Sequence, residues 1–260
     1  MAGPAPAIPS FTSNRSIRKW AFPHRGKVGD SPEGAGRTKL PFPVAPCDQT
    51  PMPDPDWLTW TREMQAIAQT GLAFCKDPYD IERYEQLRAL ASRMMAAHTG
   101  ADAARIESLF AGEQGYATPK LDVRAAVFNE AGEILLVREA ADEGRWTLPG
   151  GWADVNLTPA ENCAKEVREE SGYEVRVERL VALWDRTRQG HGPLAFSVAK
   201  AVFLCAVTGG APATSLETTG VGWFPRGAVP DDISAGRTLK GQILRLFDYA
   251  ADPLLPAAFD

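Results

Sequence analysis

Between positions 56 and 110 the hydrophobic residues recur at three- and four-residue spacings, the period of an amphipathic helix. The pattern predicts three helices, at residues 57–74, 79–97 and 102–110. Gly71 and the polar stretch at 76–78 interrupt it, and Asp77 followed by Pro78 is typical of a helix N-terminus. Gly100 is placed to end the second helix. A unit of this size has a thin core, so we expect its apolar stripe to pack on the next domain or on a second subunit.

After Thr118 the hydrophobic pattern changes to alternation, which is typical of strands. It predicts strands at residues 123–128, 134–137, 146–148, 174–185, 195–207 and 220–224, and helices at 158–171 and 239–250. Because strands and helices do not alternate strictly, a mixed sheet with flanking helices is favoured over a doubly wound parallel sheet. The sequence therefore predicts an α/β/α sandwich with a mixed sheet, preceded by a small all-α domain. The predicted segments are a tail at 1–51, a helical domain at 52–114, an α/β domain at 115–252 and a C-terminal tail at 253–260.

The first 51 residues have no apolar periodicity and contain nine of the 21 prolines. They hold seven basic and three acidic residues, a net charge of +4 in a chain whose total is −5. Such a segment buries too little apolar surface to offset its ordering entropy, so we expect it to be disordered. A solvated basic tail, or a start codon assigned upstream of Met52, is favoured over a targeting or nucleic-acid-binding arm.

The composition excludes several classes of protein. With 28 Lys and Arg against 33 Asp and Glu, the chain lacks the positive charge typical of DNA-binding proteins. It has no run of 18 apolar residues and no secretory leader, which favours a cytoplasmic protein without membrane association. Four widely spaced cysteines and three histidines make a disulfide framework or a zinc site improbable.

The chemistry is concentrated between Leu148 and Gly172. A predicted strand ends in Leu-Pro-Gly-Gly-Trp, and a helix follows whose start is marked by Thr158, Pro159 and Glu161. Within that helix Glu166, Glu169 and Glu170 stand at positions i, i+3 and i+4, so they share one face. Oxygen ligands at that density suit Mg²⁺ or Mn²⁺, although an acidic helix face is more often simply solvated. The Gly-Gly loop at a fixed distance favours the metal interpretation.

This segment resembles the signature of the Nudix family, which is Gly, five residues, Glu, seven residues, Arg-Glu, an aliphatic residue, any residue, Glu-Glu, any residue and Gly. The matching positions are Gly151, Glu166, Val167, Glu169, Glu170 and Gly172. Two positions depart: Leu157 stands where the signature has glutamate, and Lys165 where it has arginine. Glu161 does not replace the missing acid, because its spacing is wrong and helix capping already explains it.

The resemblance extends to a Nudix subgroup with a helical N-terminal domain, whose members hydrolyse nucleoside diphosphates linked to another moiety. The stretches that carry it are residues 65–73, 76–80, 115–120 and 150–157, the last including Leu157. In that subgroup the leucine is ordinary. The resemblance implies metal-dependent hydrolysis of a pyrophosphate bond, with ADP-ribose or CDP-choline as the substrate class. We also expect a homodimer built through the helical domain, because its stripe exposes apolar surface.

The implied site follows from the same match. We expect catalysis from Glu166, Glu169, Glu170, Lys165 and Glu217, a Mg²⁺ or Mn²⁺ ion on Gly151, Glu166, Glu169 and Glu170, and substrate contacts from Gly150, Trp152 and Asp185. Lys165 would orient the carboxylates as a point charge, and Glu217 is the candidate general base, although an ordinary exposed loop glutamate fits its position equally well. His191, in a turn, is either a phosphate contact or a surface residue.

Two other functions remain open. An RNA 5′-pyrophosphohydrolase would use the same metal chemistry, but the acidic composition disfavours RNA binding. A catalytically silent nucleotide-sensing module is supported by the missing carboxylate at Leu157. Binding of ADP-ribose without metal-dependent turnover would identify such a module.

Overall fold

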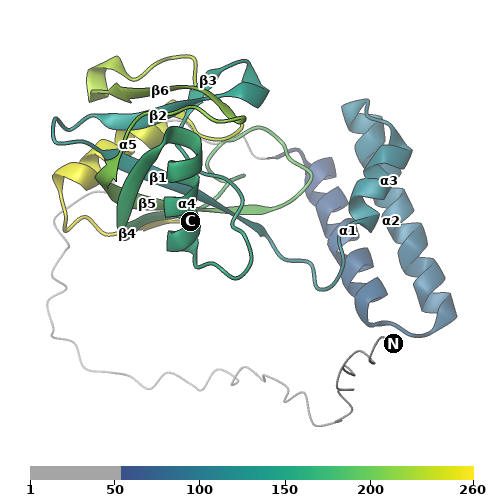
Figure 1. Cartoon of the computed structure of the whole chain (residues 1–260). Helices are drawn as coiled ribbons and strands as arrows, with labels where there is room; N and C mark the ends of the chain where they lie inside the picture. Colours follow the sequence, from purple (N-terminus) through teal and green to yellow (C-terminus); the bar gives the residue numbers. More distant parts are fainter. Residues whose placement is uncertain (1–53) are drawn as a thin grey trace, which may run out of the picture. The chain divides into compact units, whose positions relative to one another are not determined.

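The computed structural model describes residues 54–260 (Figure 1). The tail predicted at 1–51 lies outside the described residues. Within residues 54–260 no helix is long and apolar enough to cross a lipid bilayer. The helices are α1 (Asp56–Phe74), α2 (Pro78–Thr99), α3 (Ala103–Ala111), α4 (Pro159–Ser171) and α5 (Lys240–Ala251), with short 3-10 turns at Ala140–Asp142 and Arg226–Ala228. The strands are β1 (Lys120–Phe128), β2 (Ile134–Glu139), β3 (Arg145–Thr147), β4 (Tyr173–Asp185), β5 (Val198–Gly210), β6 (Thr218–Phe224) and β7 (Ala258–Phe259).

The three predicted N-terminal helices are confirmed. The Asp77 side chain accepts hydrogen bonds from the first two free amides of α2, those of Tyr79 and Asp80. Gly100 ends α2 in the left-handed conformation, with φ at 71°. The buried core of this region is made by Leu58, Ala91, Met95, Ile106 and Phe110.

Gly71 does not interrupt α1, which continues to Phe74. A Cβ at this position would lie 2.4 Å from the ring of Tyr84 on α2. The glycine therefore allows two helices to approach closely, and its role is in packing rather than in breaking the helix.

The strand expected from residue 195 begins only at Val198. The preceding residues, Ala195 and Phe196, pack against the core of the helical region, where Phe196 meets Phe110 edge to face. Arg62 of α1 donates to the carbonyl of Leu194 at 2.9 Å. These contacts explain why the apolar run is longer than the strand.

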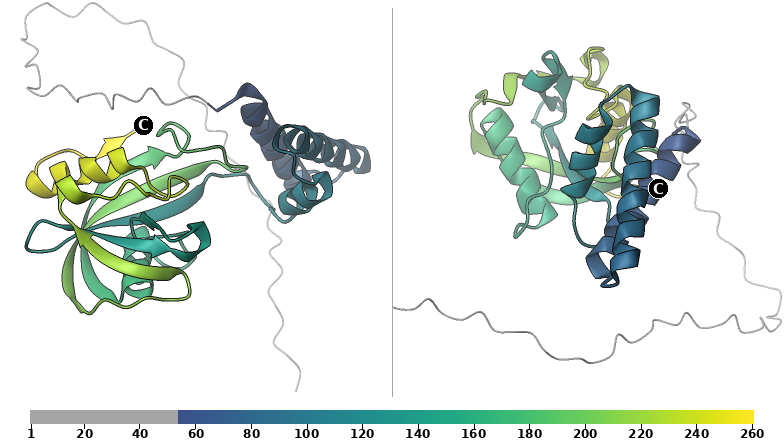
Figure 2. Two further views of the ribbon diagram at one scale, coloured as in Figure 1. Left: turned by 90° about the horizontal axis from the view of Figure 1, so that it is seen from above. Right: turned by 90° about the vertical axis from the view of Figure 1, so that its right-hand side faces the viewer.

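The sheet is mixed, as predicted. Its order is β3-β2-β1-β5-β4-β7, and β6 pairs with β2 (Figure 2). The central strands β1 and β5 run parallel, while β2 and β4 run antiparallel to their neighbours in the centre. Such an arrangement needs both faces covered by helices.

The two faces of β1 carry two separate cores. Val123, Ala125 and Val127 pack with Cys163 and Val167 of α4. On the other face Ala126 packs with the buried side chains of α5, namely Ile243, Leu246, Phe247 and Tyr249. Figures 1 and 2 show α4 and α5 on opposite faces of the sheet. The predicted α/β/α sandwich is therefore confirmed.

The last eight residues are not simply a tail. Ala258–Phe259 form β7, which pairs with β4 in parallel. The side chain of Asp260 accepts from the amide of Asp185 at 2.6 Å and from the side chain of Gln189 at 2.9 Å. Two residues are too few to show the alternation of a strand, so β7 was not predicted from the hydrophobic pattern.

His191 is buried, contrary to the expected surface turn. Its Nδ1 bonds the carbonyl of Ala235 at 2.8 Å, and its buried Nε2 has no hydrogen-bond partner within residues 54–260. Burial, helped by the positive charges of Lys200 and Arg186, lowers the pKa of His191 from 6.5 to about 4. The ring is therefore neutral in the folded protein at physiological pH.

This burial predicts a specific pH dependence of stability. Because the pKa is lower in the folded chain, the unfolded chain binds more protons between pH 6.5 and 4, and stability falls as the pH falls through that window. His191→Asn keeps a donor for Ala235 and removes the titration. We expect the wild type to lose about 2 kcal/mol more than the variant between pH 7.5 and 5 in urea unfolding. Equal losses in the two proteins would contradict this account.

Candidate active site

The Gly-Gly loop lies flat on strand β1. The amide of Val123 donates to the carbonyl of Gly151 at 2.8 Å, and the amide of Ala125 donates to that of Pro149 at 2.9 Å. Gly150 has φ at 140°, and a Cβ there would lie 2.0 Å from the carbonyl oxygen of Val123. Only glycine fits this close backbone approach.

Helix α4 begins and ends as its sequence predicts. The Thr158 hydroxyl accepts from the amide of Glu161, and the Glu161 carboxylate accepts from the amide of Thr158, which completes the capping box. Gly172 ends the helix with φ at 75°, and a Cβ there would lie 2.4 Å from the carbonyl oxygen of Ala211. Both ends of α4 are thus fixed, and with them the carboxylates along it.

Glu170 and Glu166 face the Gly-Gly loop. Glu170 is buried, and its Oε2 accepts from the amide of Gly150 at 2.8 Å. The Oε2 of Glu166 lies 2.9 Å from where a Cβ on Gly151 would be. Burial raises the pKa of Glu170 to about 7, and burial also raises the pKa of Glu166. The charge of Glu166 raises the pKa of Glu170 further, and the charge of Glu169 raises that of Glu166, so these carboxylates are short of positive charge.

Glu169 takes a different position from the other two carboxylates. It is exposed and accepts from the ammonium of Lys165 at 2.8 Å. The same ammonium lies 3.3 Å from Asp154 and 3.6 Å from Glu166. The hydrogen bond with Glu169 raises the pKa of Lys165 above its usual range. Lys165 therefore joins the exposed side of the carboxylate cluster to the loop before α4.

The two inward-facing carboxylates fit a divalent cation. Within residues 54–260 no group of three or more His, Cys, Asp or Glu side chains is arranged to hold an ion by itself. Mg²⁺ commonly binds through one or two carboxylates and keeps its other positions for waters and substrate phosphates. A site made by Glu166 and Glu170 fits this way of binding. The raised pKa values of both carboxyls indicate a lack of positive charge, which a bound cation would supply.

A buried ion cluster lies behind the loop, and the sequence analysis missed it. The Arg124 guanidinium makes two 2.9 Å hydrogen bonds to the carboxylate of Asp122 and a 3.1 Å bond to the carbonyl of Leu148. Lys200, the partner of Asp122 across β1 and β5, donates to that carboxylate at 2.8 Å. The available signal was charge at buried strand positions, where unpaired charge is costly.

The electrostatics of this cluster favour ionised partners. Burial opposes the charge on Asp122, but Arg124 and Lys200 outweigh it and lower its pKa. Burial lowers the pKa of Lys200 to about 8. Arg124 also faces the charges of Glu170 and Glu166. It therefore holds the carbonyl of Leu148 and partly balances the carboxylates of Glu166 and Glu170.

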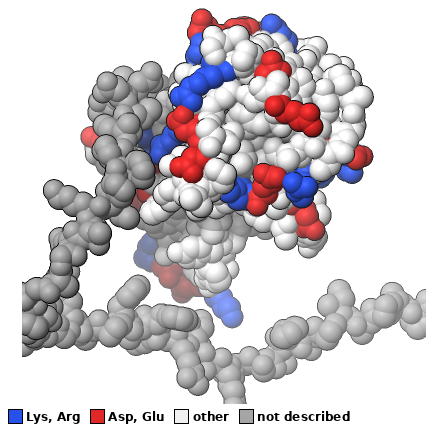
Figure 3. All heavy atoms as spheres, turned by 90° about the vertical axis from the view of Figure 1, so that its left-hand side faces the viewer, with Lys and Arg blue, Asp and Glu red and all other residues white. Residues whose placement is uncertain are grey.

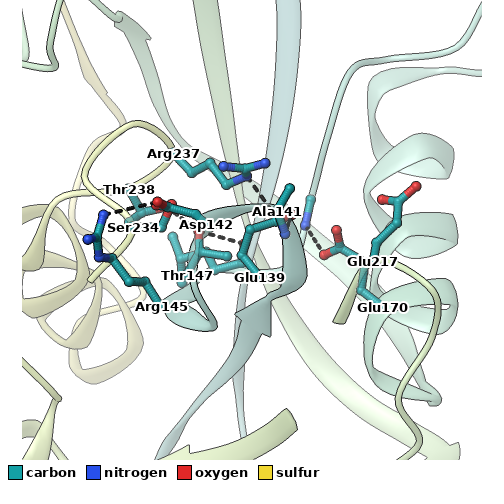
Figure 4. Close-up of polar contacts among 12 residues, drawn as sticks. Glu139, Ala141, Asp142, Arg145, Thr147, Glu170, Glu217, Ser234, Arg237 and Thr238 are labelled. Carbon is teal, nitrogen blue, oxygen red and sulfur yellow. Dashed lines mark hydrogen bonds and ion pairs between the residues drawn. The ribbon is translucent and has the colours of Figure 1, made fainter. Parts of the chain in front are cut away.

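Glu139 was also missed. It ends β2 as a buried carboxylate that accepts from the amide of Ala141 at 3.2 Å and pairs with Arg237 at 3.0 Å (Figure 4). Its charge is one of those that raise the pKa of Glu170. The sequence placed Glu139 at a strand end, where an exposed residue is ordinary.

Glu217 lies in the exposed loop before β6. Its carbonyl accepts from the amide of Ala140 at 2.8 Å, and the hydroxyl of the next residue, Thr218, donates to the carbonyl of Glu170 at 2.7 Å. Figure 4 shows Glu217 and Glu170 on the same side of Glu139. The backbone thus brings Glu217 beside α4, and its role as general base stays a prediction.

The other two residues predicted to bind substrate, Trp152 and Asp185, make their hydrogen bonds and backbone pairing with residues other than the glutamates of α4. Trp152 is 52% exposed and pairs through its backbone with Asp122. The Asp185 carboxylate accepts from the amides of Thr187 and Arg188, so it caps the turn after β4. Among the described residues neither makes a hydrogen bond or ion pair with Glu166 or Glu170, and their roles in substrate binding stay predictions.

Comparison with known proteins agrees with this geometry. Residues 55–110 match a family described as a UDP-X-like, N-terminal oligomerisation domain, and residues 118–247 match the NUDIX domain. The chain is 44% identical over 204 residues to the Bacillus subtilis protein named "Putative ADP-ribose pyrophosphatase YjhB", covering 78% of this chain and 97% of that one. It is 35% identical over 128 residues to a MutT-like protein of Streptomyces ambofaciens, covering 49% of this chain and 75% of that one.

A solved structure adds the same assignment for the whole described region. The crystal structure of a UDP-X diphosphatase shares 34% identity and a TM-score of 0.50, and the match covers 80% of this chain and all of that one. Both the helical region and the sandwich therefore have counterparts in one relative. The chain belongs to the Nudix hydrolase family.

Proposed function

We propose that this protein hydrolyses the pyrophosphate bond of a nucleoside diphosphate linked to a second group, of the ADP-ribose or CDP-choline class, with Mg²⁺ or Mn²⁺. The observation that carries the proposal is the placement of Glu166 and Glu170 against the loop of Gly150 and Gly151. Similarity to a protein named as a putative ADP-ribose pyrophosphatase and to a UDP-X diphosphatase supports the substrate class.

The position of each residue suggests its role in the proposed reaction. Glu166 and Glu170 would hold the ion, and Gly151 has a carbonyl that already accepts from Val123 and keeps a second lone pair. When bound, the ion would neutralise negative charge on the phosphates and lower the pKa of a bound water. Glu169 and Lys165 keep the outer face of the cluster ordered, and Arg124 fixes the loop from behind. Glu217 is the candidate to take the proton of the attacking water.

The exposed surface favours a small-molecule substrate over RNA. On the face drawn in Figure 3, acidic and basic side chains of the described region are interspersed among uncharged atoms. RNA binding by phosphate contacts needs a continuous basic surface. Turnover measured with Mg²⁺ or Mn²⁺ on ADP-ribose, CDP-choline, a UDP-sugar, NADH and capped RNA tests the choice. Preference for capped RNA, or binding of ADP-ribose with no turnover of any compound, would overturn the proposal.

The carboxylates give the first prediction. Glu166→Gln and Glu170→Gln keep the side-chain shape and remove a charge that the ion needs, so we expect kcat to drop by about a hundredfold or more. Thermal stability without metal should hold or rise, because both carboxyls have pKa values raised by burial. Glu178→Gln, at an exposed glutamate of β4, is the control and should leave kcat unchanged. Near-normal kcat in both site variants would exclude them as metal ligands.

Leu157 gives the second prediction. The side chain is 41% exposed, so the packed environment that would resist a new charge is absent. Lys165 already pairs with Asp154 and Glu169, so it does not need an acid at position 157 as a partner. We expect Leu157→Glu to change kcat/KM less than about threefold and to fold normally, since exposed substitutions have small effects. A tenfold gain would mean that Leu157 is a defect in the site.

The helical region gives the third prediction. Trp60, Ile67 and Phe74 recur every seven residues on one face of α1 and are 54%, 49% and 68% exposed. We propose that this face makes a homodimer, in line with the family description of an oligomerisation domain. Ile67→Asp with Phe74→Asp should halve the mass in light scattering at micromolar concentration and leave the helical content intact. Leu254→Asp, at a residue 91% exposed, should not. A monomeric wild type would remove this claim.

A further inference from the structure

Arg237 has a guanidinium that the protein holds on one side only. Its Nε lies 3.0 Å from the Oε2 of Glu139, and its side chain is 33% exposed while that of Glu139 is 8% exposed. No other group within residues 54–260 makes a hydrogen bond or ion pair with this guanidinium. Both terminal nitrogens are therefore free to donate. Two parallel donors from a planar fork match the oxygens of a phosphate.

The loop that carries Arg237 is fixed by backbone bonds. The amide of Ser234 donates to the carbonyl of Trp146 at 2.8 Å, and the amide of Arg237 donates to that of Ser234, also at 2.8 Å. The hydroxyls of Thr147 and Thr238 lie 3.1 Å apart, which ties the end of the loop to β3 (Figure 4). The guanidinium thus starts from an ordered backbone and ends on a buried carboxylate, so little rotamer freedom remains to be lost on binding.

Glu139, the partner of Arg237, is connected to the proposed metal site through strand β6. Glu139 pairs across the sheet with Thr218, whose hydroxyl donates to the carbonyl of Glu170 at 2.7 Å. Figure 4 shows Arg237 paired with Glu139 and Glu170 lying beyond Glu139 on the side of α4. A diphosphate with one phosphate at the ion proposed on Glu170 would have a cation, Arg237 in the loop before α5, paired with the neighbouring carboxylate of Glu139.

We propose that Arg237 binds a phosphate of the nucleoside diphosphate substrate and that Glu139 is the residue that positions it. This inference rests on the function proposed above. The carboxylate of Glu139 is buried and its charge needs a partner, so it keeps the guanidinium in place when no substrate is bound. Arg237 then supplies a positive charge separate from that of Arg124, whose guanidinium is already bound to Asp122 and to the carbonyl of Leu148.

Binding measured without metal tests Arg237 apart from catalysis. In calorimetry with EDTA, we expect Arg237→Gln to raise the Kd for ADP-ribose by about 10- to 100-fold, the scale of a lost charge-assisted hydrogen bond. Arg237→Lys should be intermediate, and adenosine should bind all variants alike. With Mg²⁺, KM should rise by a similar factor and kcat should change less. Arg145→Gln is the control, because that arginine is 44% exposed and both its terminal nitrogens already pair with Asp142 and Glu143.

A double-mutant cycle tests the positioning role. Glu139→Gln should weaken ADP-ribose binding by several-fold, and in the Arg237→Gln background it should have no further effect. Effects that simply multiply, or a Glu139→Gln variant that loses kcat with unchanged Kd, would show that Glu139 acts on the metal side and not through Arg237.

The outcomes separate this inference from the proposed function. A wild type that hydrolyses ADP-ribose, with Arg237→Gln binding it equally well, overturns the role of Arg237 alone. A wild type that binds ADP-ribose through Arg237 but hydrolyses nothing overturns the proposed function alone. Failure of the wild type to bind or hydrolyse ADP-ribose, CDP-choline and a UDP-sugar overturns both.

Discussion

The close contact between the Gly-Gly loop and strand β1 is the constraint on which the site depends. Gly150 lies where a Cβ would be 2.0 Å from the carbonyl oxygen of Val123, so the loop can lie flat only without a side chain. That position turns the amide of Gly150 toward Glu170. It also leaves room at Gly151 for the carboxylate of Glu166. Two carboxylates one helical turn apart thereby meet the end of a strand with no side chain between them.

The charge balance follows from this geometry. Carboxylates drawn into a buried position carry raised pKa values, and the chain offsets them only in part. Arg124 faces them from behind, but its guanidinium is shared with Asp122 and with the carbonyl of Leu148. Lys200 serves Asp122 rather than the glutamates. The remaining deficit of positive charge is what a divalent cation and a phosphate-binding group are suited to fill.

Local signals made much of this predictable. Asp77, Gly100, Thr158 and Glu161 are capping residues whose effect depends on their near neighbours, and all four act as the sequence predicted. The mixed sheet followed from hydrophobic periodicity alone. The spacing of Glu166 and Glu170 placed both on the inner face of one helix. These features depend on chemistry within about one or two turns of chain.

The errors and omissions came from contacts between distant residues. In the sequence alone, Arg124 is only a polar residue of a predicted strand. Its ion cluster becomes evident when β1 pairs with β5, because that pairing places Asp122 opposite Lys200. From the sequence, Gly71 is interpreted as a helix break, whereas in the structure the ring of Tyr84 occupies the space beside it. His191 is interpreted as a turn residue, whereas in the structure its ring is buried and hydrogen-bonded to the carbonyl of Ala235. Each depends on a partner outside its own element, which periodicity does not encode.

The loop before α5 links these long-range contacts into one unit. Its carbonyls at Ala235 and Gly236 accept from His191 and Arg186, while Arg237 turns the other way to Glu139. One short segment therefore touches the end of β2, the turn after β4 and, through Thr238, strand β3. A substitution that shifts this loop would move Arg237 relative to Glu170 without touching α4. Because α4 is anchored separately by its capping box and by Gly172, the phosphate contact proposed for Arg237 can change while the carboxylates of α4 stay in place.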